Sequence, residues 1–410
     1  MNLKEKLAQL ERQTRRPPLH RKNEKPQALR NLPEGEELVL SEGRFYRMIR
    51  RFPLQHTHGD VLIGGLRTRS LEGARFIVRN PAVQTIHAEE LLFLDTETTG
   101  LSGGVGTMAF LIGIGYFLED SFWVEQIFAR DFREERAALA YLLNRSQPFV
   151  ALVSYNGKSF DWPLLVNRWI LNRLPPPNHL RHHLDLLFLS RRLWRRTIGE
   201  CTLGNVEKQI LNVRRFGDVP GYLVPQIYFD FLRSRDATEL QKVFYHNQMD
   251  VLSLAALLDF QLDILDGRLD GKTLDPVALG KLFVEMKEME KGEEVLKNHG
   301  QHSSLETPFA QEVALFLARL YKRRGEWESA LALWKQALAD GRFSVEPYEE
   351  LAKFYEHHQR NYTKALEYTD SALRKIDILE KLGRGGQWQG VRKALIYRRD
   401  RLHRKLQGKQ

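Results

Sequence analysis

Apolar residues in the N-terminal two thirds of the chain follow patterns typical of β-strands, with helical patterns between them. Three apolar segments follow one another at 91–97, 107–117 and 121–129, and each predicts a strand. A helical pattern at 133–145 precedes a fourth apolar segment at 149–155. Three consecutive strands followed by alternation of helix and strand predict an α/β fold, a mixed sheet flanked by helices.

Helical patterns dominate after the fourth strand. They cover residues 161–173, 184–194, 203–211, 224–233 and 237–260. Pro163 falls in the first turn of the first of these helices, where its missing N–H is harmless, and Ser159 is its expected N-cap.

The remaining segments differ in character from this central α/β region, which we place at 89–265. Residues 1–35 are polar, basic and proline-containing, and predict a mobile arm. Residues 36–88 hold short strand-like segments and predict an accessory β extension. Strand patterns vanish after residue 270, so 270–405 is expected to be an all-α domain.

Two segments of the C-terminal region resemble each other. They align with an offset of 34 residues from Leu317 to Leu351, and one extra residue then brings Trp327 opposite Tyr362. Small residues recur where paired helices approach closely, at Ala330, Ala337, Ala365 and Ala372. This pattern resembles tetratricopeptide repeats. Two clear repeats are few for an independent solenoid, so we expect these helices also to pack on the α/β domain.

Composition narrows the class of protein. The chain has 410 residues, of which 42 % are hydrophobic, a value ordinary for a soluble protein of two or three domains. No apolar run is long enough to cross a bilayer, and the first residues lack the apolar core of a signal peptide. The single cysteine, Cys201, excludes an internal disulfide, and a cytoplasmic location is expected. The net charge of +10 favours a polyanionic partner.

Four carboxylates stand out by their order and setting. Asp95 and Glu97 end the first apolar strand, and because they are two residues apart they share one face. Asp161 opens the first helix of the series, and Asp250 lies within the last. Acidic groups that converge from strand and helix ends repel one another unless a cation lies between them. Such a cluster suits two Mg²⁺ or Mn²⁺ ions about 4 Å apart, the arrangement that hydrolyses phosphodiesters.

The three segments that carry these carboxylates, DTETTGL, NGKSFDWPLL and HNQMDVLSL, resemble the motifs of DEDD-type 3′–5′ exonucleases with a ribonuclease H-like fold. More narrowly, the chain resembles bacterial YprB-type exonuclease proteins, in which tetratricopeptide-like helices follow this domain. The resemblance covers roughly residues 40–260, with a weaker match beyond. It implies a 3′–5′ exonuclease in which Asp95, Glu97, Asp161 and Asp250 hold two divalent ions. One ion would activate the attacking water and the other would stabilise the departing 3′ oxygen.

The general base is assigned from helix geometry. His246 lies four residues before Asp250 and Tyr245 lies five before it, so the residue types are exchanged relative to the two best-known exonuclease patterns. A residue five positions back is rotated by about 140° from the aspartate, whereas one four back shares its face. We therefore expect His246 to accept the proton of the attacking water. The alternative is a histidine hydrogen-bonded within the helix packing.

Basic and polar residues near these motifs are candidates for phosphate contact. Asn156 and Lys158 lie in the segment that leads into the Asp161 helix. A basic cluster on a later helix comprises Arg191, Arg192, Arg195 and Arg196. Clustered cations attract nucleic acid, although a solvated helix face is the simpler explanation of such a cluster taken alone. DNA and RNA both remain open as substrates, and the helical repeats offer a surface for a protein partner.

Other polar residues support weaker interpretations. Asp185 either supports the carboxylate site or caps the helix that follows it, and we favour the cap. His56 and His58 lack a third ligand for zinc and are expected at the surface. The glycines at 100–106 lack the lysine of a phosphate-binding loop and predict a tight connection. The alternative function for the whole chain is a non-cleaving scaffold that binds nucleic acid or protein.

Overall fold

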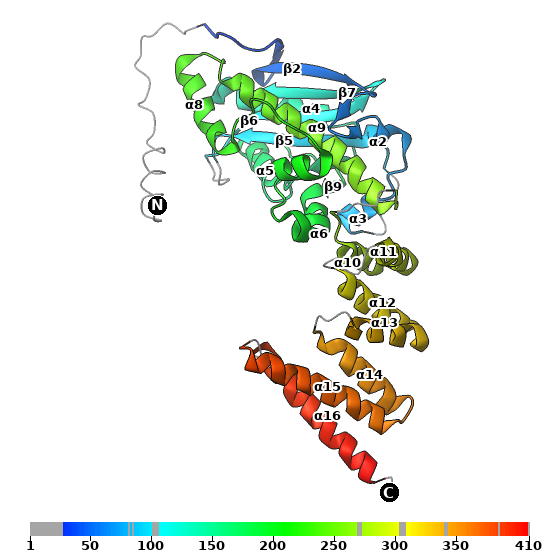
Figure 1. Ribbon diagram of the computed structural model, residues 1–410. Helices are drawn as coiled ribbons and strands as arrows, with labels where there is room; N and C mark the ends of the chain where they lie inside the picture. The colour runs from blue at the N-terminus through cyan, green and yellow to red at the C-terminus, as the bar shows by residue number, and fades with distance from the viewer. Residues whose placement is uncertain are drawn as a thin grey trace.

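A mixed sheet of seven strands forms the centre of the N-terminal part, in the order β1-β2-β7-β6-β5-β8-β9 (Figure 1). β5 pairs in parallel with β8 and β8 with β9, and the other neighbours are antiparallel. The predicted α/β mixed sheet is therefore confirmed. The strands of this sheet are β1 (Glu36–Leu40), β2 (Gly43–Pro53), β5 (Leu91–Thr98), β6 (Ala109–Leu118), β7 (Ser121–Phe128), β8 (Ala151–Ser154) and β9 (His182–Asp185).

The computed structural model describes residues 28–80, 83, 86–100, 106–268, 273–302, 309–339, 343–383 and 386–408. Most of the expected N-terminal arm and of the glycine-rich connection lies outside these described residues. A hairpin of β3 (Thr57–His58) and β4 (Val61–Leu62) stands apart from the main sheet.

The helices of the N-terminal part are α2 (Gly65–Thr68), α3 (Ala74–Val78), α4 (Glu135–Arg145), α5 (Asp161–Leu171), α6 (Leu186–Ile198), α7 (Leu203–Val206), α8 (Val224–Ser234) and α9 (Leu240–Leu265). Short 3₁₀ turns lie at Ala88–Glu90, Phe132–Glu134, Gly221–Leu223 and Gly386–Trp388, and Glu207–Leu211 is a π-helical turn. The C-terminal helices are α10 (Pro276–Glu285), α11 (Met289–His302), α12 (Ala310–Arg324), α13 (Trp327–Ala339), α14 (Val345–His357), α15 (Tyr362–Lys381) and α16 (Gln389–Gln407).

Two local predictions need correction. Residues 182–185 form the edge strand β9, whereas the sequence pattern began a helix at 184. The short polar segment carries no strand pattern, and pairing with β8 makes it a strand. The expected mobile arm ends earlier than residue 35, since the Arg30 backbone pairs with the connection between α8 and α9. The first strands extend the main sheet, because β2 pairs with β7 along its length.

The sheet has a core on each face. Leu92 and Leu94 of β5 pack in a core with α4 and α5, while Leu91 and Phe93 pack in the core that contains α9. Because side chains alternate along a strand, Asp95 continues the series that faces α9. The apolar half of β5 therefore fixes the direction in which its acidic half points.

Helix α9 lies across β5 and β6, as Figure 1 shows. The close approach depends on glycine at two positions of β6. A Cβ atom on Gly113 would lie 2.3 Å from Oδ1 of Asn247, and one on Gly115 would lie 2.6 Å from Cγ1 of Val251. Any side chain at Gly113 would push α9 away from the strand that carries the acidic residues.

The C-terminal helices extend from one end of the α/β domain as an arm (Figure 1). Leu279 and Phe283 of α10 belong to the main core of the α/β domain, so the apolar packing on this domain is made by α10, which precedes the two repeats, and not by the repeat helices as expected. Trp334 is fully buried in a separate cluster formed by the arm itself, where Ala330 and Ala365 are fully buried too. None of the described helices is long and apolar enough to cross a membrane.

Candidate active site

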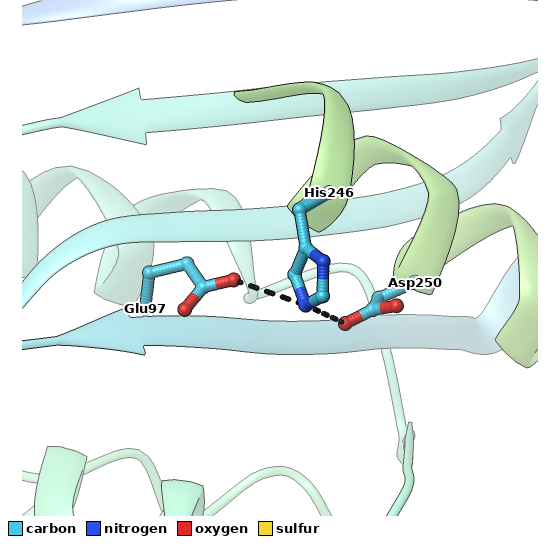
Figure 2. Close-up of side chains that lie close together, drawn as sticks. All are labelled: Glu97, His246 and Asp250. Atoms are coloured by element: carbon cyan, nitrogen blue, oxygen red, sulfur yellow. Dashed lines mark ion pairs between the residues drawn. The ribbon is translucent and has the colours of Figure 1, made fainter. Parts of the chain in front are cut away.

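The centre of the site is formed by one residue of β5 and two residues of α9 (Figure 2). The Nε2 atom of His246 lies 3.8 Å from Oε1 of Glu97 and 3.4 Å from Oδ2 of Asp250. The three side chains are 12–19 % exposed, so the cluster is mostly shielded from solvent. One possible ligand atom from each residue lies within 4.8 Å of the others, a spacing that would fit a single metal ion.

His246 is held in place by a carboxylate behind it. Its Nδ1 lies 2.8 Å from Oδ1 of Asp218, and the guanidinium of Arg215 approaches the same nitrogen at 3.4 Å. The shorter contact makes Nδ1–H the donor and Asp218 the acceptor. This tautomer leaves the lone pair of Nε2 directed toward Glu97 and Asp250. The structure therefore places His246 where the helix-face argument put it.

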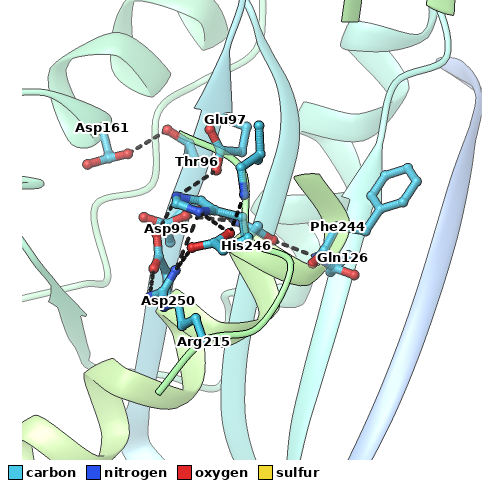
Figure 3. A network of polar contacts seen from close by, with 12 residues as sticks. Asp95, Thr96, Glu97, Gln126, Asp161, Arg215, Phe244, His246 and Asp250 are labelled. Atoms are coloured by element: carbon cyan, nitrogen blue, oxygen red, sulfur yellow. Dashed lines mark hydrogen bonds and ion pairs between the residues drawn. The ribbon is translucent and has the colours of Figure 1, made fainter. Parts of the chain in front are cut away.

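Asp95 is oriented by an amide network from α9 and β7 (Figure 3). Nδ2 of Asn247 donates to Oδ2 of Asp95 at 2.8 Å. Gln126 in turn donates to Oδ1 of Asn247 at 2.9 Å and to the backbone oxygen of Phe244 at 2.8 Å. Burial, together with the charges of nearby carboxylates, raises the pKa of Asp95 well above its usual value. The same causes raise the pKa of Glu97.

Asp161 lies at the first residue of α5, to one side of the central cluster (Figure 3). One of its carboxylate oxygens accepts a hydrogen bond from the hydroxyl of Thr96, which points to the other face of β5 from Asp95. Burial raises the pKa of Asp161 to about 6. Its charge also contributes to raising the pKa of Asp95 and of Glu97, so the four carboxylates form one electrostatic unit.

The turn between β8 and α5 is shaped by Asp185. Its carboxylate accepts from the backbone N–H of Asn156 at 2.8 Å and of Lys158 at 3.0 Å, and also caps α6 through the N–H of Leu187. Asp185 thus acts both as the expected cap and as a support for the Asp161 turn. Asn156 adopts a left-handed conformation with φ of 65°, which asparagine tolerates better than most residues.

The predicted cap of α5 is wrong. The N-cap position falls at Phe160, and no side-chain cap is formed there by the described residues. Backbone hydrogen bonds to the oxygens of Asn156 and Gly157 connect the chain to the helix instead. A Cβ atom on Gly157 would lie 2.3 Å from Oγ of Ser154, so this turn accepts only glycine in its present form.

Arg215 is a central cation of the site, although no sequence pattern assigned it a role there. Its guanidinium contacts the carboxylates of Asp250, Glu207 and Asp218. Burial alone would lower its pKa, but the neighbouring carboxylates outweigh burial and raise it. Glu207 is itself 1 % exposed and accepts from the hydroxyl of Ser253.

The same polar network reaches the small hairpin. Nε2 of His58 lies 2.6 Å from Oγ of Ser253, and His58 is 4 % exposed. The expectation of a surface histidine is therefore wrong at this position. Burial, with the charge of Arg215, lowers the pKa of His58 to about 4, so it is a neutral hydrogen-bonding partner near pH 7.

The donor set fits a divalent cation. Asp95, Glu97, Asp161 and Asp250 present hard oxygen ligands, the type that Mg²⁺ and Mn²⁺ prefer. The single positive charge of Arg215 is shared with Glu207 and Asp218, so it cannot balance these four groups. Carboxylates with raised pKa values regain their charged form when a cation is bound nearby. The side chains on α9 and β5 would hold the cation between them.

The expected basic cluster divides into two pairs on α6. Arg192 forms a two-point contact with Glu285, at 2.7 and 2.8 Å, and Arg196 contacts Asp275 at 3.1 Å and Glu312 at 2.6 Å. These carboxylates belong to α10, its N-cap and α12, so this pair joins the α/β domain to the arm. Arg191 and Arg195 are exposed, as is Lys158.

Sequence reasoning missed four residues that shape the site: Arg215, Asp218, Glu207 and Asn247. Arg215 and Asp218 come from the connection that leads to α8, which has no period that would direct a side chain toward the sheet, and Glu207 lies in the helical pattern predicted at 203–211. Asn247 lies within the HNQMD motif and could have been found, because a polar residue fully buried on a helix needs a partner.

Comparison with known proteins agrees with this geometry. Residues 92–261 match the RNase H superfamily, a class of nuclease domains, and this range contains all four carboxylates and His246. The chain is also 33 % identical over 337 residues to a Bacillus subtilis (strain 168) protein called uncharacterized protein YprB, covering 80 % of each chain. The chain belongs to the YprB family.

Proposed function

We propose that this protein is a metal-dependent 3′–5′ exonuclease of the DEDD type. Asp95, Glu97, Asp161 and Asp250 are the proposed ligands of two divalent ions, Mg²⁺ or Mn²⁺, and His246 is the proposed general base. The observation that carries the proposal is the direction of His246 Nε2, 3.4 Å from Asp250 and 3.8 Å from Glu97. The 3′–5′ direction is supported by the motif resemblance, whereas the carboxylate cluster supports phosphodiester hydrolysis in general.

Bound divalent ions would supply an activated water and charge stabilisation for the departing oxygen. Other residues of the chain orient the proposed metal ligands and the proposed base. Asn247 fixes the direction of Asp95, and Thr96 fixes that of Asp161. Asp218 holds the Nδ1–H of His246, and thereby stabilises the imidazolium that forms when Nε2 accepts a proton. Asp218 is a positioning residue, because it acts through His246.

The alternative is a scaffold that binds nucleic acid without cutting it. Its support is the contact between Arg215 and Asp250, because a guanidinium already satisfies a carboxylate that metal binding would use. The two functions differ in their response to metal. A nuclease should gain thermal stability when Mn²⁺ or Mg²⁺ binds and compensates the buried carboxylates, whereas the scaffold should gain none.

The activity test uses single strands of DNA and RNA labelled at the 5′ or the 3′ end. With Mg²⁺ or Mn²⁺, we expect 5′-labelled strands to shorten stepwise and 3′-labelled strands to release labelled mononucleotide at once. Stepwise shortening of the 3′-labelled strands instead would contradict the 3′–5′ direction.

Asp95→Asn and Asp161→Asn should each abolish cleavage, because neutral amides hold dications poorly. A variant rate within about tenfold of the parent, only ~1.4 kcal/mol in the barrier, would contradict the metal assignment.

We also propose the division of the chain into a basic arm (1–35), a β extension (36–88), the exonuclease domain (89–265) and a tetratricopeptide-like domain (270–405). Support for the last comes from α12 to α15, which form two antiparallel pairs with buried alanines at the matched positions. Nucleic acid is the proposed substrate, and the cytoplasm is the proposed location.

A further inference from the structure

A pocket of about 320 Å³ lies in the helical arm, between the ends of α12 and α14, the start of α13, and α16. Its volume falls in the range of small-ligand sites. It belongs to neither the carboxylate site nor the contact between the arm and the α/β domain. The residues that line it are Lys322, Trp327, Glu350, Lys353, Phe354, His357, His358, Arg398 and Arg401.

Beside the pocket, one buried carboxylate accepts hydrogen bonds from three cations, so it does not neutralise all of their charge. Glu356 is 2 % exposed and accepts from Arg398 at 2.9 Å, from Arg401 at 2.7 Å and from Lys405 at 2.9 Å. Three positive charges thus surround one negative charge. The hydrogen bonds fix the positions of the cations, so the excess of positive charge is part of the fold.

A second carboxylate of the pocket is shared by two lysines. Lys322 and Lys353 both contact the carboxylate of Glu350, and their side chains are 39 % and 40 % exposed. Four of these cations line the pocket, and the two carboxylates that contact them leave an excess of two positive charges. Glu349 reaches Lys353 only at 3.9 Å. A site with this balance favours an anionic ligand.

Aromatic rings form the apolar part of the pocket. The ring of His358 lies 4.2 Å from that of Trp327, and it stacks on Phe354 with an angle of 16° between the planes. His358 is exposed and Trp327 is half-buried, so ring surface remains open to a ligand. Cations for phosphate beside rings for a planar base are the two features that single-stranded nucleic acid needs.

The neighbouring helix favours nucleic acid over an acidic peptide. Along α16 there are seven lysine and arginine residues and one aspartate, and Tyr397 of this helix is 63 % exposed. Arg398 and Arg401, two of these cations, line the pocket. A basic helix with an exposed ring continues the same surface chemistry beyond the pocket. An acidic peptide would use the charge but not the rings.

We propose that this arm pocket binds single-stranded nucleic acid, with one base against His358 and Trp327 and the adjacent phosphates at Lys322 and Lys353. It is a second binding site, separate from the site of cleavage. The proposal goes beyond the exonuclease activity and does not depend on it, because binding needs neither metal nor hydrolysis.

The test measures binding of fluorescein-labelled 12-nucleotide dT and rU strands to the full chain in EDTA, across a range of salt concentrations. Lys322→Gln with Lys353→Gln should weaken binding at least tenfold. Loss of two phosphate contacts should reduce the slope of log Kd against log salt by about 1.4. His358→Ala should weaken binding several-fold while leaving the salt slope unchanged.

Equal effects of these substitutions on binding of dT and rU would support recognition of base and phosphate. An effect on rU binding alone would support an additional contact with the ribose hydroxyl.

Matched control variants distinguish an effect of the pocket from an effect of the total charge of the protein. Lys375→Gln with Lys381→Gln makes the same charge change on exposed positions of α15, and His403→Ala removes an exposed histidine of α16. Both should change Kd less than threefold, with thermal unfolding checked for every variant. Equal weakening by the pocket and control pairs would overturn the proposal. A second result would also overturn it. If a twelve-residue glutamate peptide displaced the labelled strand as well as unlabelled strand does, the pocket would be assigned to acidic peptides.

Discussion

The α/β domain and the helical arm bury their apolar surface in opposite ways. The main core of the domain joins residues from Val61 to Phe283, and the site joins β5, α5 and α9. In the arm, α12 packs on α13, α14 on α15, and α15 on α16, each a neighbour in sequence. Contacts between distant segments place carboxylates with atomic precision, whereas contacts between neighbours build an extended surface. A destabilising substitution should therefore affect the whole α/β domain when it lies in the domain, and only the nearby helices when it lies in the arm.

The two regions also differ in charge. In the domain, burial raises the pKa of Asp95, Glu97 and Asp161, and the charges of neighbouring carboxylates raise it further. Carboxylates outnumber the cations there. In the arm, salt bridges from Arg401 and Lys405 lower the pKa of Glu356 despite its burial, because cations outnumber carboxylates there. The same two residue classes thus produce a cation site in one region and an anion site in the other.

The largest expected effect concerns the general base in the domain. His246→Ala should lower the cleavage rate about 10²–10⁴-fold, because Nε2 is the proposed proton acceptor. Metal affinity, measured by Mn²⁺-dependent thermal stabilisation, should change little. Tyr245→Phe is the matched control on the adjacent residue and should have a small effect. A larger loss for Tyr245→Phe than for His246→Ala would assign the proton transfer to tyrosine.

Much of this site could be predicted from local patterns. The continuous apolar run at 91–94 predicted the strand β5, and the two-residue spacing of Asp95 and Glu97 placed both on one face of it. The spacing of His246 and Asp250 placed both on one face of α9. These inferences needed only the geometry of a single strand or helix.

The residues that depend on contacts between distant segments could not be predicted in this way. Arg215 and Asp218 lie between helices, and the direction of their side chains is set by partners on α9 rather than by a repeat. The partners of Arg192 and Arg196 lie about 80 to 120 positions further along the chain. A basic cluster on one helix therefore gave no sign that it joins two regions.

A change in the arm core should have the next largest effect. Trp334 is fully buried, so Trp334→Ala should lower the free energy of unfolding of the arm by about 3–5 kcal/mol. Cleavage of short oligonucleotides should remain near the parent rate, because Trp334 packs in a cluster that contains no residue of the α/β domain. Hydrogen exchange should show loss of protection in α12 to α15 and none in β5 to β8.

Trp334→Phe is the control for ring volume. The Nε1–H of Trp334 is buried and without a hydrogen-bond partner among the described residues, so replacing indole with phenyl removes an unsatisfied donor. We expect a loss well below that of the alanine variant. Equal losses of protection in the arm and the sheet for Trp334→Ala would contradict the contrast between local and spreading damage.

The smallest effect separates the two arginine pairs of α6, where the domain meets the arm. Arg192→Gln with Arg196→Gln removes the contacts to Glu285 and Glu312, and also the contact to Asp275, whose carboxylate keeps a hydrogen bond from the backbone N–H of Ala278. The two contacts to glutamate are partly exposed, so each should contribute about 1 kcal/mol or less to stability, measured by chemical denaturation. Arg191→Gln with Arg195→Gln makes the same charge change on the same helix but removes exposed side chains. If these two contact phosphate, their loss should reduce the salt slope of single-strand binding by about 1.4 and leave stability unchanged. An unchanged slope would make Arg191 and Arg195 part of a solvated helix face, and would leave the arm pocket as the better candidate for phosphate contact outside the site of cleavage.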